Sequence, residues 1–189
     1  MINYLTDDDA LDIHDVLVEM FRSEDPIDPP GVRDSNLLGS ALTRPMTGSG
    51  DVDKYDTIER KAAALFHSMV KNHPFHNGNK RTALVSMLVF LDRNGTRLNG
   101  DVSEDEIFDL VTAVAADDFP PTKPGLSDDE VVREVAGWLR DRSTRRTATL
   151  PEMNTSDFLE KCKLAGGAYR ESGGSWIVAQ ASATRCFQP

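Results

Sequence analysis

A short polar loop between two helical stretches limits what this chain can fold into more than any other feature. Residues 73–81 read His-Pro-Phe-His-Asn-Gly-Asn-Lys-Arg. Upstream, residues 58–70 place apolar side chains at the i, i+4, i+7 and i+8 spacing of an amphipathic helix. Pro74 disfavours helical backbone in the residue before it, so this helix should end near Asn72. Downstream, residues 83–91 are apolar on nearly all sides, which predicts a buried central helix.

The loop places reactive groups at the start of the second helix. Gly78 and Asn79 fall where backbone N–H groups have no intrahelical partner and the helix dipole is positive. Lys80 and Arg81 lie just inside the same helix, so this end is suited to bind phosphate. His73, one loop away, can accept a proton from a hydroxyl group. Together these residues indicate phosphate transfer from a nucleotide to a hydroxyl.

Each of these residues also has a purely structural interpretation. A loop histidine can simply be hydrogen-bonded, and Gly78 can provide a positive φ angle. Asn77 or Asn79 can cap a helix, and the two cations can form a solvated face. Phe75 is expected to anchor the loop in the core under either interpretation. The functional interpretation is favoured because all of these residues fall within one helix-loop-helix.

The motif also resembles the signature of a known family, Fic/Doc. The resemblance rests on the pattern His73-Pro74-Phe75-x-x-Gly78-Asn79-Lys80-Arg81 followed by Thr82-Ala83. Residues 4–6, 31–34 and 61–63 are also similar to Doc-like sequences. The chain is closer to the Doc branch, the toxins of Phd/Doc toxin–antitoxin modules, than to Fic AMP-transferases. Those enzymes usually have glycine in place of Lys80 and a second arginine in place of Leu84.

The resemblance implies a role for each motif residue. His73 would be the general base that activates the target hydroxyl, and Phe75 would pin the loop. The anion hole and the sites for nucleotide phosphates would be formed by Asn77, Gly78, Asn79, Lys80 and Arg81. The resemblance further implies ATP as co-substrate, with Mg²⁺, and transfer of the γ-phosphoryl group to elongation factor Tu, which stops translation. A Phd-like antitoxin would be a second protein partner.

Asn77 departs from the family pattern, which usually has Asp or Glu there as a ligand of Mg²⁺. A neutral amide oxygen is a weaker ligand for this hard cation, so Asn77 would be a weak metal ligand. Two alternatives to a Doc-like kinase stay open. One is a Fic-type AMP-transferase that modifies a protein hydroxyl, and the other is a weakly active or inactive nucleotide-binding regulatory module. Lys80 and Leu84 favour the kinase, whereas Asn77 favours neither enzyme.

Helix signals along the rest of the chain predict an all-α, Fic/Doc-like bundle around the buried central helix, with a small α+β C-terminal appendage. Capping-box patterns at Ser103-x-x-Glu106 and Ser127-x-x-Glu130 each precede an amphipathic stretch. We predict a catalytic domain over residues 1–142, a basic linker over 143–152 and a C-terminal segment of unknown role over 153–189. In the last segment we expect a short helix over 155–164 and then two short strands.

A polar segment over residues 43–55 contains Pro45, Gly48 and Gly50 and is predicted to form a mobile flap. The resemblance implies that this flap lies beside the active site and aligns the target peptide.

Composition limits the partners and the compartment. The 189 residues carry a net charge of −10, which argues against direct binding to nucleic acid or to an anionic membrane. The chain shows no signal peptide and no apolar run long enough to span a bilayer. Its two cysteines do not make a disulfide framework, so we expect a cytoplasmic protein.

Overall fold

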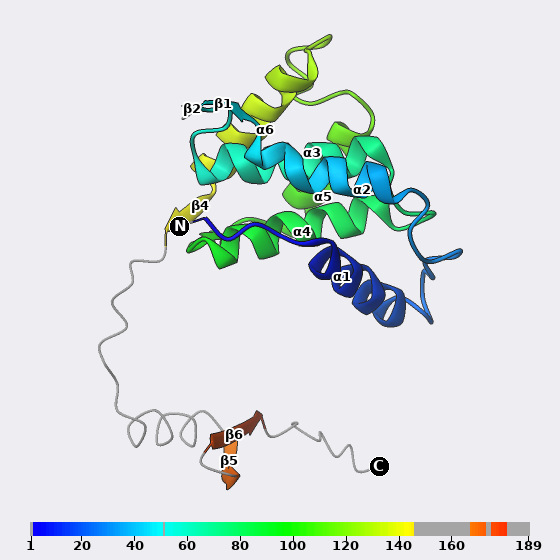
Figure 1. Cartoon of the computed structure of the whole chain (residues 1–189), viewed down its shortest axis with the longest axis vertical. Helices are drawn as coiled ribbons and strands as arrows, with labels where there is room; N and C mark the ends of the chain where they lie inside the picture. Colours follow the sequence, from blue (N-terminus) through cyan, green and yellow to red (C-terminus); the bar gives the residue numbers. More distant parts are fainter. Residues whose placement is uncertain (1, 51, 146–166, 173–174, 181–189) are drawn as a thin grey trace, which may run out of the picture. The chain divides into compact units, whose positions relative to one another are not determined.

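Six α-helices form the framework of the described chain (Figure 1). They are α1 (Asp7–Met20), α2 (Ser35–Thr43), α3 (Ile58–Asn72), α4 (Asn79–Arg93), α5 (Glu104–Ala115) and α6 (Asp128–Asp141). The computed structural model describes residues 2–50, 52–145, 167–172 and 175–180. The chain divides into two units, Met1–Arg146, which holds these six helices, and Thr147–Pro189. The predicted mostly helical bundle with small C-terminal strands is confirmed.

The helix starts follow the local sequence. At the start of α5 the Glu106 N–H donates to Ser103 Oγ (3.2 Å), and the Ser103 N–H donates to the Glu106 carboxylate (3.1 Å). At the start of α6 the Glu130 carboxylate accepts from the Ser127 N–H (2.9 Å). Both capping boxes agree with the prediction, since each depends only on residues within one helical turn.

The most enclosed helix is α3, not the apolar stretch 83–91 within α4 that the sequence indicates. Eleven of the fifteen residues of α3 are buried, against six of fifteen in α4. α3 packs against α2, α4 and α6 (Figure 1). Its residues 62–64 are three fully buried alanines, and these small side chains let neighbouring helices approach closely from several sides. α4 instead leaves Leu84 and Leu88 only partly buried.

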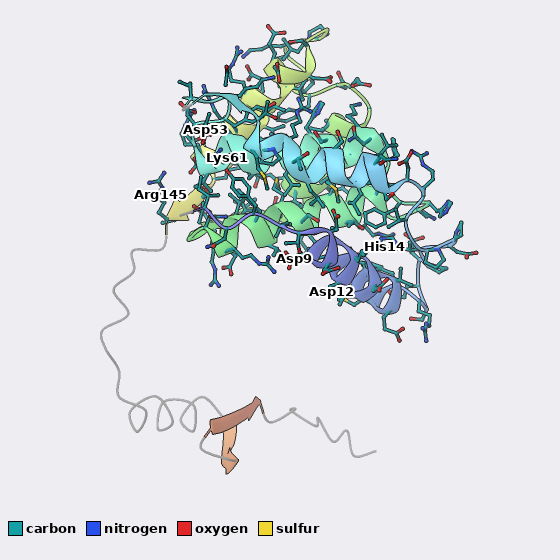
Figure 2. All side chains as sticks on the ribbon, viewed as in Figure 1. Asp9, Asp12, His14, Asp53, Lys61 and Arg145 are labelled. Carbon is teal, nitrogen blue, oxygen red and sulfur yellow. The ribbon has the colours of Figure 1, made fainter. Side chains whose placement is uncertain are left out.

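The segment predicted as a flap lies at the opposite end of α3 from residues 73–81. It consists of the 3-10 helix η1 (Arg44–Met46) and the paired strands β1 (Gly48–Ser49) and β2 (Val52–Asp53). Near the start of α3, the buried Lys61 donates to the Asp53 carboxylate (2.8 Å) and to the Pro45 carbonyl (3.1 Å), which fixes the hairpin there (Figure 2). Lys61 lies eleven residues before Asn72, so at 1.5 Å per residue the hairpin is about 17 Å along α3 from the loop. The prediction that the segment lies beside the motif is therefore wrong.

Residues 143–145 belong to the bundle rather than to a linker. They form β4 (Ser143–Arg145), which pairs antiparallel with β3 (Thr96–Leu98). The Asn99 N–H extends this pairing by donating to the Arg142 carbonyl (2.8 Å). The linker predicted over 143–152 thus starts too early, because a strand partner 45 residues or more away in the sequence cannot be read from local composition. Residues 146–152 lie outside the described residues.

The second unit contains an antiparallel pair of strands, β5 (Gly167–Ser172) and β6 (Ser175–Gln180). These are the two strands that the sequence predicts. The helix predicted over 155–164 lies outside the described residues. Within the described ranges, no helix has the length and apolar character needed to cross a membrane.

Candidate nucleotide-phosphate site

Residues 73–78 form the turn that joins α3 to α4. α3 ends at Asn72, as Pro74 predicts, and His73 follows in left-handed backbone conformation, with φ 49° and ψ 57°. Such a conformation costs a non-glycine residue about 1–2 kcal/mol. The side chain of His73 is exposed to solvent. Backbone strain of this kind is frequent at functional sites, where the surrounding structure enforces it.

Phe75 fastens the turn to the core. It is fully buried, and its ring stacks on the imidazole of His14 with centroids 4.1 Å apart and 12° between the planes. The side chain of Asn79 closes the turn around it. Its amide oxygen accepts from the Phe75 N–H (2.9 Å), and its amide nitrogen donates to the Phe75 carbonyl (2.8 Å). The turn is therefore held by one aromatic anchor and one side-chain clamp.

Gly78 sets the direction in which α4 begins. Its φ angle is +74°, and a Cβ added at this position would lie 2.9 Å from the Cδ1 atom of Ile27. Glycine is therefore required both by the backbone and by the packing. In the described part of the chain no side chain caps α4, so the N–H groups of its first turn have no capping partner. The positive end of α4 can thus receive an anion.

A segment from before α2 lies along this turn, and its sequence does not mark it as part of the site. Residues 25–34, called the strap from here on, follow α1 and precede α2. The His76 N–H donates to the Gly31 carbonyl (3.0 Å), and the Arg33 N–H donates to the Pro74 carbonyl (2.7 Å). In the sequence, part of the strap stands out because residues 31–34 are similar to Doc-like sequences. The strap, rather than the predicted flap, is the segment beside the motif.

The predicted site residues face one pocket of about 620 Å³. Its lining comprises Asp25, Pro26, His73, His76, Asn77, Gly78, Asn79, Lys80, Arg81 and Ala115. All the residues that we expected to bind phosphate are therefore brought together with the expected base. The strap supplies Asp25 and Pro26, and the end of α5 supplies Ala115.

Arg81 is held in place by the strap and by α1. Its guanidinium forms an ion pair with the Asp25 carboxylate and donates to the Asp25 carbonyl (3.0 Å). On its other side the guanidinium lies 4.2 Å from the centroid of the Phe21 ring. Lys80 is exposed at the rim of the same pocket. A phosphate group that binds Arg81 must therefore compete with Asp25.

Asn77 is engaged on both sides of its amide. The oxygen accepts from the Gly78 N–H (2.7 Å), and the nitrogen donates to the carbonyl of Asp28 in the strap (3.0 Å). An amide oxygen has two lone pairs and only one is used here, so Asn77 stays the weak metal ligand that the sequence predicts. Among the residues that the structure describes, no group of three or more His, Cys, Asp or Glu side chains could hold a metal ion. The protein side of the pocket thus fits a phosphate better than a metal held by the protein alone.

Comparison with known proteins agrees with this geometry. Residues 4–91 match the model of the Fic/DOC family. The chain is also 38% identical over 107 residues to the protein called Toxin Doc from Mycolicibacterium smegmatis (strain ATCC 700084 / mc(2)155). That alignment covers 57% of this chain and 77% of the relative. The chain belongs to the Fic/Doc family, and within it the chain is Doc-like.

Proposed function

We propose that this protein is a Doc-like toxin that transfers the γ-phosphoryl group of ATP to a hydroxyl group of a protein. The observation that carries the proposal is the meeting of His73, the uncapped start of α4 and two cations, Lys80 and Arg81, in one pocket. A base, an anion site and an opening to solvent are the parts that such a transfer needs.

In this proposal His73 accepts the proton of the target hydroxyl while the oxygen forms a bond to the γ-phosphorus. The bond from that phosphorus to the bridging oxygen of ADP breaks, and ADP leaves with the electron pair. The N–H groups at the start of α4, with Lys80 and Arg81, bind the phosphate oxygens and stabilise their charge. Arg81 reaches them by exchanging the Asp25 carboxylate for phosphate, while its bond to the Asp25 carbonyl (3.0 Å) keeps the guanidinium in place.

We infer that Mg²⁺ enters the pocket bound to the phosphates of ATP, where it neutralises their charge. The Asn77 amide is already hydrogen-bonded at both ends, and the carboxylate that lines the pocket, Asp25, is paired with Arg81. The proposed roles of the protein in the transfer therefore fall to residues of the turn, the strap and α4.

The direction of transfer is suggested by Leu84. The position where Fic AMP-transferases have a second arginine lies in an adjoining apolar pocket, which Phe21, Ile107 and Phe108 also line. Leu84 gives this side of α4 an apolar surface instead of a second cation. This difference from the Fic AMP-transferases supports transfer of the γ-phosphoryl group rather than of AMP.

We propose elongation factor Tu as the target, so that its modification inhibits translation. A Phd-like antitoxin is the partner that we propose to restrain the toxin. The name of the relative, Toxin Doc, supports the toxin assignment.

The test is transfer of label from ATP to purified elongation factor Tu, with the label at the γ-position or at the α-position. We expect label from γ only, and a mass increase of one phosphate. Label from α would favour the AMP-transferase. His73→Ala should abolish transfer, and Asn36→Ala, at an exposed residue of α2 outside the pocket, is the control. Full transfer by His73→Ala would refute the base assignment.

A further inference from the structure

The orientation of the Asn77 amide is fixed by its neighbours. The Gly78 N–H can only donate, so the atom 2.7 Å from it must be the amide oxygen. The amide nitrogen then faces the Asp28 carbonyl at 3.0 Å, which can only accept. An aspartate at position 77 could keep the first contact, but it would set a carboxylate oxygen against the Asp28 carbonyl. An amide at position 77 therefore makes a hydrogen bond to the Asp28 carbonyl that a carboxylate cannot make.

A second side chain holds the strap at its other end. The Gly31 N–H donates to Nε2 of His14 (3.0 Å), and Nδ1 of His14 lies 3.1 Å from Oγ1 of Thr82 in α4. Since the Gly31 N–H can only donate, Nε2 is unprotonated and Nδ1 carries the hydrogen. The imidazole is buried, and its stacking on Phe75 joins it to the motif turn. Protonation of Nε2 would remove the acceptor for Gly31.

Between these two points the strap forms one wall of the pocket. Ile27 packs on Gly78, and Asp25 holds the guanidinium of Arg81. A strap that detached at Asp28 or at Gly31 would take away the Asp25 carbonyl that orients the guanidinium of Arg81. The two holding contacts therefore act on the phosphate site through the strap, and the Asn77 side chain also lines the pocket itself.

We propose that His14 and Asn77 are positioning residues. Their neutral imidazole and amide hold the strap against the motif turn, and the strap in turn holds Arg81 of α4 through Asp25. The effect on nucleotide binding rests on the proposed function, whereas the effect on the strap does not. The charged group near His14 is Asp15 on its own helix; Thr82, Gly31 and Phe75, which pack on the ring, do not titrate. Burial lowers the pKa of His14, and the Asp15 charge opposes this in part.

The first test is amide hydrogen exchange of the full chain, free of ligand, measured residue by residue by NMR. Loss of one holding contact should lower the protection factors of the Gly31 and His76 amides by about tenfold or more, with no change at Phe66 in α3. We expect this for Asn77→Asp and for Asn77→Leu. Asn36→Asp, which adds the same charge on an exposed residue of α2, should change neither amide. Full protection in Asn77→Asp would overturn the proposal.

The second test asks whether the protonation state of His14, and not only its packing, controls the hold on the strap. In the wild type, the protection factor of the Gly31 amide should fall as the pH is lowered and His14 takes up a proton. In His14→Gln, whose amide oxygen can accept from Gly31 but does not titrate, the protection factor should not depend on pH. An equal pH dependence in both proteins would refute the role of His14.

The third test links the strap to the site. Binding of a non-hydrolysable ATP analogue with Mg²⁺, measured by calorimetry, should weaken about fivefold or more in Asn77→Leu, which loses the hydrogen bond to the strap and adds no charge to the pocket. Tighter binding in Asn77→Asp would show a metal ligand at position 77 and overturn the clamp. If the wild type binds no nucleotide, the proposed function fails while the exchange results still decide the role of the strap.

Discussion

Adding one methyl group at Gly78 tests how tightly the strap packs on the motif turn. In Gly78→Ala the new Cβ would lie 2.9 Å from Cδ1 of Ile27, closer than real Cβ atoms come, and 3.0 Å from its Cγ2, which is also tight. Ile27 is buried, so it cannot simply swing into solvent. The residue would also have to keep a φ angle of +74°. The substitution therefore introduces both backbone strain and overlap with the strap.

The two contributions can be estimated separately. Left-handed backbone costs an alanine about 1–2 kcal/mol. Overpacking by one methyl group in a rigid site costs about 1–3 kcal/mol. Gly78→Ala should therefore lower the free energy of unfolding by about 2–5 kcal/mol. Gly95→Ala is the matched control, because Gly95 has a φ angle of +72° with no atom within 4 Å of the added Cβ. It should show the backbone cost alone.

Urea unfolding followed by circular dichroism, with linear extrapolation, measures these differences. Both alanine variants restrict the unfolded chain equally, so their difference isolates the overlap with Ile27. In an Ile27→Ala background the overlap should vanish, which gives a coupling of about 1–3 kcal/mol in the double-mutant cycle. Equal values for Gly78→Ala and Gly95→Ala, with no coupling to Ile27, would refute the packing of the strap on Gly78.

Three further predictions concern stability. Burial, reinforced by the Arg44 charge, lowers the pKa of His67 from 6.5 to about 4. As the pH drops below 6.5, the unfolded chain takes up a proton on His67 before the folded chain does, so the free energy of unfolding should fall. Measured by urea titration, this free energy should drop by about 2 kcal/mol more in the wild type than in His67→Gln between pH 7.5 and pH 5. No difference in slope between the two proteins would contradict the buried neutral imidazole. Lys61→Met removes the donor to the Pro45 carbonyl and should cost about 1–3 kcal/mol in the same assay, with faster amide exchange in β1 and β2. His73→Gly relieves the left-handed backbone strain and should raise the free energy of unfolding by up to about 1 kcal/mol, while transfer is lost. If the variant is instead less stable than the wild type, the side chain of His73 supports the fold.

The sequence by itself determines the features that depend on near neighbours. The end of α3 follows from Pro74, and the starts of α5 and α6 follow from capping boxes four residues long. The motif residues meet in one pocket because they are consecutive in a single turn, whose shape is set by Gly78 and Phe75. Short-range sterics and hydrogen bonding are sufficient for each of these, and all of them can be read from sequence.

The tertiary structure alone decides which distant segments complete the site. The Asn77 amide meets a carbonyl 49 residues earlier in the chain, and His14 reaches Thr82 across 68 residues. Periodicity cannot reveal such pairings, since they depend on which donors and acceptors face each other after packing. For the same reason, apolar content points to α4 as the central helix, whereas the small alanines of α3 allow helices to pack closely around it and make it the one enclosed.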